Sequence, residues 1–416
     1  MAQRIANHVL SRTPFKPYIF RVDDLLRTVN EKAYEPAMVA IGPYHHGKKI
    51  LERMEEHKSK YLQQLLQRRN ESSVDKYVAK LRALEEEARS CYAEPISLDK
   101  DKFVEMMLVD GCFIIEFLRK TKMKELVDED DPIFQIDRIK NILGRDLILF
   151  ENQLPLFILV QLFNMTKHSD DHMNDMDIAE IALNFLGRKL PCSKGIQAST
   201  RVSIDNFDHL LGLMHHRWSP SFAEMAPNRN VGNQDKLQLI KSTTELERVG
   251  IKFRKAVNTS LFDIRFRKKI MKIPSITVND ETECLFRNLI AYEQYHQNFC
   301  QNYVTGYATF MNCLIDSAKD VEALRSYGII ENRLADDASV SAMFNKLCSN
   351  VAINRRKFCY SHVLEKVNDY RPGFLKKKYA ELKYRLRDPL TFLNVKFSVV
   401  TIVLAAIQIM DLVNKS

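Results

Sequence analysis

The chain has 416 residues, of which 45% are hydrophobic and 28% charged, a balance that excludes an intrinsically disordered chain. Only 12 glycines and 13 prolines are present, which argues against a turn-rich sandwich or barrel, and the eight cysteines form no C-x-x-C pair that would indicate a metal ribbon. The formal net charge of +9 is concentrated in residues 248–272 and 352–387, each with a net charge of +8.

The first half of the sequence predicts long helices. Residues 49–69 and 74–92 carry apolar side chains at helical spacing on one face. Residues 103–118 and 146–163 are apolar nearly all round, but acidic residues interrupt them and make them poor bilayer spans. We expect these two segments to be helices in the middle of the core, with Pro155 kinking or restarting the second one.

Farther along the chain, the periodicity changes from helical to alternating. Residues 164–177 and 219–240 are polar and turn-rich, typical of loops. Apolar and basic residues then alternate in 249–254 and 262–267, and a small sheet is predicted within about 246–278. Phe and Arg at period two point to opposite faces of a strand, so only the charges reach solvent. This pattern fits anionic lipid or an acidic partner and makes nucleic acid unlikely.

Helical spacing returns at Thr282 and continues to about Val351. The C-terminal residues 390–413 are mostly apolar, and Phe397–Met410 contains no charge. We predict a C-terminal transmembrane helix here, with an amphipathic surface helix as the competing interpretation. The preceding basic segment includes Lys376, Lys377 and Lys378, which would face anionic lipid.

One motif resembles a phosphate-binding loop. Gly42–Lys48 fits G-x-x-x-x-G-K, but the hydroxyl residue that should follow and bind magnesium is replaced by Lys49. Pro43 also lacks one backbone N–H that would contact phosphate. We therefore predict a turn that leads into a helix, without a bound nucleotide.

A second motif places Glu293, His296 and Cys300 on one helical face. Glu-x-x-His is half of a di-iron carboxylate signature, but that site requires two copies, and we find one. A lone His and Cys supply at most two ligands of a zinc site. A half-buried helix with mixed polar residues is the favoured interpretation.

Polar residues interrupt the two most apolar segments: Asp110 and Glu116 in the first, Glu151, Asn152 and Gln153 in the second. Buried carboxylates can be acid–base pairs, or they can accept hydrogen bonds and pair with Lys and Arg. Since no nucleophile motif lies nearby, the structural role is favoured. We assign no catalytic, cofactor-binding or metal-binding residues.

Several stretches together resemble a plant protein family, the domain-of-unknown-function 247 family. The stretches are YEPAMVAIGPYHHGKK (34–49), MLVDGCFIIEFL (107–118), DLILFENQLPLFIL (146–159), ELERVGIKFRK (245–255), LFRNLIAYEQYH (285–296) and ENRLADDASVSAMFNKL (331–347). The resemblance implies a plant-specific, largely helical protein that is membrane-associated through its C-terminus and has no established enzymatic activity. Some grass members are associated with self-incompatibility, which is a recognition role.

The predicted fold is mainly α, with a small β-sheet insertion and a C-terminal transmembrane helix. Its parts are an N-terminal segment (1–33), a helical family domain (34–387) with a basic juxtamembrane part (352–387), and a membrane anchor (390–413). The N-terminus has no apolar stretch long enough for a signal peptide, so the main domain should be cytosolic, at the plasma membrane or an endomembrane. The predicted function is non-enzymatic recognition or signalling scaffolding. The alternative is a hydrolase or transferase that uses the core carboxylates.

Overall fold

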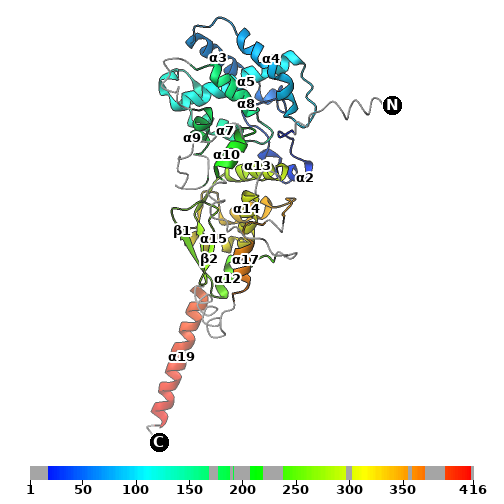
Figure 1. Cartoon of the computed structure of the whole chain (residues 1–416). Coiled ribbons are helices and arrows are strands. Elements are labelled where there is room, and N and C mark those ends of the chain that lie inside the picture. Colours follow the sequence, from blue (N-terminus) through cyan, green and yellow to red (C-terminus); the bar gives the residue numbers. More distant parts are fainter. Residues whose placement is uncertain are drawn as a thin grey trace, which may run out of the picture.

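The computed structural model describes residues 17–167, 177–187, 191, 207–218, 238–296, 302–354, 358–370 and 389–413. The mainly helical fold with small sheets is confirmed (Figure 1). The α-helices are α2 (Asp24–Arg27), α3 (Arg53–Arg68), α4 (Asp75–Ser90), α5 (Lys100–Lys122), α6 (Pro132–Gln135), α7 (Asp137–Asp146), α8 (Leu156–Met165), α9 (Ile178–Leu186), α10 (Leu210–Trp218), α12 (Thr243–Arg248), α13 (Thr282–Tyr295), α14 (Tyr303–Leu314), α15 (Ala318–Ser326), α16 (Asp337–Leu347), α17 (Ser361–Asn368) and α19 (Pro389–Val413). Short 3-10 helices are η1 (Glu31–Ala33), η2 (Lys49–Leu51) and η3 (Lys124–Leu126).

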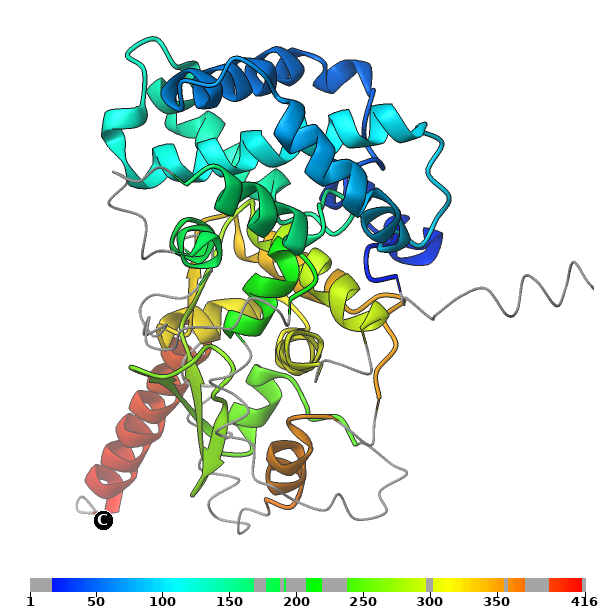
Figure 2. The same ribbon diagram turned by 45° about the horizontal axis from the view of Figure 1, so that its top comes forward.

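Helix α5 is the central element of the N-terminal part. It packs against α3, α4 and α8 (Figure 2). The side chain of Asp99 caps its first turn by accepting a hydrogen bond from the Lys102 N–H, and its apolar residues are buried on nearly all sides. The predicted core helix at 103–118 is therefore confirmed and is longer than predicted.

The predicted helix at 146–163 is helical only from Leu156 onward. Helix α7 ends at Asp146, and α8 begins after Pro155, so Pro155 restarts the helix as expected. Residues 147–155, between the two helices, are buried and not helical. Side-chain amides donate hydrogen bonds to carbonyls of this segment. Gln153 Nε2 donates to the carbonyls of Leu147 and Leu149, both at 2.8 Å. These bonds replace the helical ones that the apolar run had suggested.

Helix α13 joins the N-terminal part to the rest of the chain. It packs against α10, α14 and α16, and one hydrophobic core runs through both parts. The buried Asn288 on α13 accepts a hydrogen bond from the Phe150 N–H at 2.8 Å and donates to the Ala33 carbonyl at 2.8 Å. One side-chain amide of α13 therefore binds two segments that are distant from it and from each other in sequence.

The sheets are smaller than predicted. Strands β1 (Lys252–Ala256), β3 (Ile270–Pro274) and β2 (Arg265–Arg267) form one sheet in the order β1-β3-β2. Strands β4 (Ile276–Val278) and β5 (Ile330–Asn332) form a second, parallel pair. The predicted strand at 249–254 begins late because α12 occupies the residues before it and Gly250 turns with φ +90°. Strand β5 lies where only helix was predicted.

The C-terminal segment does not form the predicted transmembrane helix. No helix in the described part of the chain, α19 included, is both long and apolar enough to cross a bilayer. The uncharged stretch between Lys396 and Asp411 covers about 21 Å at about 1.5 Å per residue, whereas a bilayer core is about 30 Å thick. The prediction of a span was therefore wrong.

Other predicted features lie outside the described residues. These are most of the two predicted loops (168–176 and 219–237), together with Cys300 and Lys376, Lys377 and Lys378. The expected contact of these lysines with anionic lipid stays a prediction.

Candidate functional site

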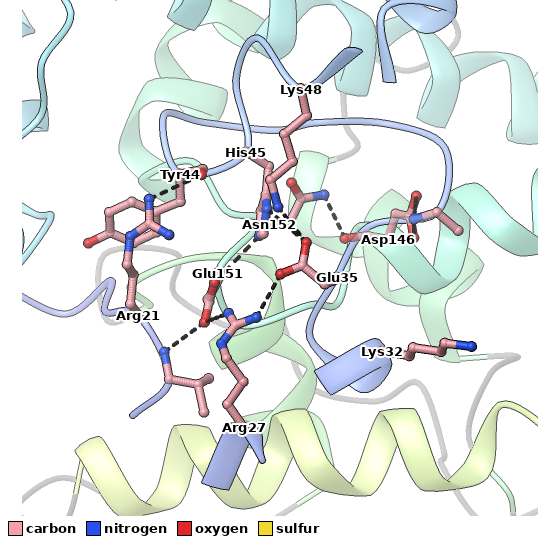
Figure 3. A network of polar contacts seen from close by, with 12 residues as sticks. Arg21, Arg27, Lys32, Glu35, Tyr44, His45, Lys48, Asp146, Glu151 and Asn152 are labelled. Atoms are coloured by element: carbon pink, nitrogen blue, oxygen red, sulfur yellow. Dashed lines mark hydrogen bonds and ion pairs between the residues drawn. The ribbon is translucent and has the colours of Figure 1, made fainter. Parts of the chain in front are cut away.

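Two segments more than a hundred residues apart meet in a partly buried polar cluster (Figure 3). We call Arg27, Glu35, His45, Lys48 and Glu151 the Glu35–Glu151 cluster. Arg27 donates to both carboxylates, to Glu35 Oε1 at 2.6 Å and to Glu151 Oε1. Lys48 also donates to Glu35. The Arg27 guanidinium therefore ties the two carboxylates together, as its fork of donors allows.

Glu151 is buried, as predicted, and only 1% of it is exposed. Its Oε1 atom also accepts a hydrogen bond from the Val22 N–H at 2.7 Å, whereas Oε2 has no hydrogen-bond partner. Burial raises the pKa of Glu151, and the Val22 N–H and Arg27 only partly offset this. The carboxylate thus anchors the N-terminal segment to the core.

His45 lies between the two carboxylates. Nδ1 is 3.6 Å from Glu35 Oε2 and Nε2 is 3.6 Å from Glu151 Oε2, too far for hydrogen bonds, and 1% of the residue is exposed. Burial lowers the pKa of His45 to about 3, with help from the nearby Lys48 charge. His45 is therefore neutral at physiological pH. Because His45 is buried, a substrate at the protein surface could not exchange a proton with it.

A pH dependence follows from this burial. An unfolded His45 takes up a proton below pH 6.5, whereas the folded one does not until about pH 3, so its contribution to stability is present above pH 6.5 and is lost on acidification. Between pH 7 and pH 5 the loss is about 2 kcal/mol. We expect His45→Gln to remove this part of the pH dependence, measured by urea unfolding at both pH values. The neighbouring, exposed His46 supplies the control, because His46→Gln should keep the parent's dependence. Equal dependence in parent and His45→Gln would contradict the assignment.

Side-chain acceptors hold the backbone where the Gly42–Lys48 loop begins. The Gly42 N–H donates to Asp110 Oδ2 at 2.8 Å, and the Ile41 N–H donates to the Asn152 side chain at 2.7 Å. Lys48, which would contact phosphate in a nucleotide site, pairs with Glu35. Donors that a phosphate loop would offer to its ligand are thus bound within the fold. The geometry supports a structural turn.

Asp110 is buried and paired, as the structural interpretation predicted. Its Oδ1 atom accepts from Lys58 Nζ at 2.6 Å, and Lys58 is completely buried. Burial lowers the pKa of Lys58, but Asp110 and Glu55 more than offset this and hold it above its ordinary value. Asp110 thus neutralises a buried ammonium and holds the Gly42 turn.

The Glu293 motif is also structural. Glu293 accepts hydrogen bonds from His215 at 2.8 Å and from the N–H groups of Val304 and Thr305 at 2.9 and 2.7 Å, at the start of α14. His296 Nε2 instead lies 3.5 Å from Asp208. Among the described residues, no group of three His, Cys, Asp or Glu side chains is arranged to hold a metal ion.

A cleft of about 1260 Å³ lies between the end of α5, helices α6, α7 and α9, and the β4–β5 pair. It contains neither Asp110 nor Glu151, so it does not supply the substrate pocket that the enzyme alternative requires. Its lining is acidic, and it has seven acids against four bases: Asp128, Glu129, Asp131, Asp137, Asp280, Glu281 and Glu331 against Lys120, Lys124, Lys140 and Arg333. Several of these charges already pair with one another, such as Lys120 with Asp131 at 2.8 Å. No local sequence pattern reveals this cleft, because its acidic runs lie about 150 residues apart.

Comparison with known proteins gives the family. The sequence profile of the domain-of-unknown-function 247 family, described as plant protein of unknown function, matches residues 19–404. The chain belongs to this family. It is 30% identical over 399 residues to UPF0481 protein At3g47200 of Arabidopsis thaliana, covering 90% of this chain and 82% of the relative. It is 22% identical over 489 aligned positions to the putative UPF0481 protein At3g02645 of the same plant, covering 96% and 90%. No solved structure matches the chain.

The predicted membership in the domain-of-unknown-function 247 family is thus confirmed. Three stretches on which the resemblance rested meet in space: 34–49 supplies Glu35, His45 and Lys48, 146–159 supplies Glu151, and 107–118 supplies Asp110. No local sequence pattern indicates that Arg27 completes the cluster, because its partner Glu151 lies 124 residues away.

Proposed function

We propose that this protein is a non-enzymatic recognition or scaffold protein that associates with the surface of a membrane through α19. The observation that carries this proposal is the exposure of α19, which projects from one end of the molecule (Figure 1). Its large apolar side chains are between 47% and 68% exposed: Leu393, Phe397, Val399, Val400, Ile402, Val403, Leu404 and Ile407. A helix that is apolar on all sides is stable when lipid or protein covers it.

The hydroxyl groups of α19 are suited to an apolar surrounding. Ser398 donates to the Asn394 carbonyl at 2.8 Å, and Thr401 donates to the Phe397 carbonyl at 2.9 Å. Neither hydroxyl therefore presents an unsatisfied donor to hydrocarbon. The uncharged stretch Phe397–Met410 of this 25-residue helix can therefore be covered by the apolar part of a membrane.

The polar groups of the core support the non-enzymatic part of the proposal. Asp110 and Glu151 are engaged in hydrogen bonds that join segments of the fold, and neither lies in the acidic cleft. A recognition role requires a stable body with an accessible surface, and the cleft supplies one. The enzyme alternative has no comparable geometric support.

Vesicle flotation tests the membrane association. We expect the full-length protein to float with vesicles of phosphatidylcholine and phosphatidylserine. The triple variant Phe397→Gln, Ile402→Gln, Leu404→Gln should bind at least tenfold more weakly, because three exposed apolar side chains that lipid would cover are lost. The matched control carries the same change at three exposed apolar residues of the body, Leu25, Ile50 and Val257. It should float like the parent.

Two results would contradict the proposal. One is flotation of the α19 variant equal to that of the parent. The other is a parent protein that stays unbound to vesicles and self-associates through α19, which would assign the helix to a protein contact.

A further inference from the structure

The three-stranded sheet carries an in-register row of cations. Arg254 of β1 and Arg265 of β2 both pair with Lys272 of the central strand β3. The next row, Phe253, Met271 and Phe266, turns to the other face, where Phe253 and Met271 are buried. The strand pairing thus places three positive charges side by side across the solvent face.

This basic face extends beyond the central row. Its members are all exposed: Lys252, Arg254, Arg265, Arg267, Lys268, Lys269 and Lys272. Asp263 pairs with Arg265 and offsets much of the charge of that one member. We call these seven residues the basic sheet face.

The row of like charges on the basic sheet face destabilises the sheet when no anion is bound. Like charges directly opposite each other on neighbouring strands repel. The two-residue turn between β2 and β3 consists of Lys268 and Lys269, with φ of +48° and +64°. Hairpin turns with two positive φ values favour Asn and Gly, and a lysine there is strained. An anionic surface would relieve the repulsion that these residues create.

We propose that the basic sheet face binds the phosphate groups of anionic lipids while α19 inserts beside it. The inference rests on the proposed membrane association and names the lipid class. Both the sheet and α19 lie at the same end of the molecule, opposite α3 and α4 (Figure 1). Lipid is favoured over nucleic acid because the aromatic rings of the strands face the core or are half-buried, which leaves no stacking platform on the charged face.

The test compares two variants that lose the same charge. The sheet variant changes four lysines of the basic sheet face to Gln: Lys252, Lys268, Lys269 and Lys272. The control variant changes four exposed lysines elsewhere to Gln: Lys49, Lys80, Lys319 and Lys346. Both keep α19, and both lower the net charge by four, so only the position of the charges differs.

Full-length proteins are floated with neutral phosphatidylcholine vesicles and with vesicles that contain phosphatidylserine. We expect the sheet variant to bind the anionic vesicles at least tenfold more weakly than the parent, while its binding to neutral vesicles is unchanged. The control variant should lose less than threefold. Raising the salt concentration should weaken the parent on anionic vesicles and largely erase the difference, because salt screens exposed charges.

The outcome separates this inference from the proposed function. Loss of binding to both kinds of vesicle in the α19 variant supports the proposed function alone. If the sheet and control variants lost equal amounts of binding to anionic vesicles, the basic sheet face would not be the lipid-binding surface. The same conclusion would follow if the parent bound neutral and anionic vesicles equally. A parent that binds neither would overturn both proposals. The parent could also bind single-stranded RNA. If the sheet variant lost that binding but bound vesicles like the parent, the basic sheet face would be a nucleic-acid-binding surface and not a lipid-binding one.

Discussion

Asp110→Ala is expected to lower the free energy of unfolding by about 3 kcal/mol. The change leaves the Lys58 ammonium buried without its main counter-charge, and breaking such a pair costs about 3–5 kcal/mol. We place the value at the lower end because Lys58 keeps its contacts with Glu55 and the Ala40 carbonyl. The Gly42 N–H also loses its acceptor. Urea unfolding measured at pH 7 gives the difference.

Asp130→Ala is the matched control. Asp130 is 82% exposed and lies 3.7 Å from Lys60, a surface pair of the kind that contributes less than about 1 kcal/mol. The double variant Lys58→Met, Asp110→Ala should recover part of the lost stability, because no unpaired charge is then buried. If Asp110→Ala costs no more than Asp130→Ala, the buried pair does not have the assigned role.

Gly42→Ala should destabilise the protein by about 3 kcal/mol or more. Gly42 has φ +72°, and an added Cβ would lie 2.4 Å from the carbonyl oxygen of Gln153, a backbone atom that cannot rotate away. The variant therefore combines an unfavourable left-handed backbone with a steric clash. The change in stability is read from chemical unfolding curves.

Gly47→Ala separates the two contributions. Gly47 has a similar φ of +77°, but its added Cβ would meet no atom within 4 Å. We expect a cost of about 1–2 kcal/mol, from the backbone conformation alone. Equal costs for the two variants would show that the chain moves easily at Gln153, and that the Gly42 turn is not held tightly against the core.

The sequence predicted the elements that depend on local spacing. Helices α3, α4 and α5 are predictable because their apolar residues recur at helical spacing, and most of that apolar face is buried. The segment 147–155 was misread because its apolar run is also compatible with a helix. Hydrogen bonds from Asn152 and Gln153 to backbone groups decide its path, and these depend on tertiary structure.

The candidate site was less accessible to sequence reasoning. Burial of Asp110 and Glu151 could be predicted from their apolar neighbours, but their partners could not. Lys58 is 52 residues from Asp110, and Arg27 is 124 residues from Glu151. Strand β5 has three residues and acquires its pairing from β4, far earlier in the chain. Such features require the fold itself, because no local pattern encodes them.

Asn288 has a consequence for the order of events during synthesis. Its side chain satisfies the Ala33 carbonyl and the Phe150 N–H, so these groups lack that partner until about 255 further residues have followed Ala33 out of the ribosome. At about 5–20 residues per second, this interval lasts roughly 13–50 seconds. Asn350, which donates to the Leu25 carbonyl at 2.7 Å, is made later still. These backbone groups of the N-terminal part thus lack their side-chain partners for most of translation. In a fragment that ends before α13, the Ala33 carbonyl and the Phe150 N–H would never gain the Asn288 side chain.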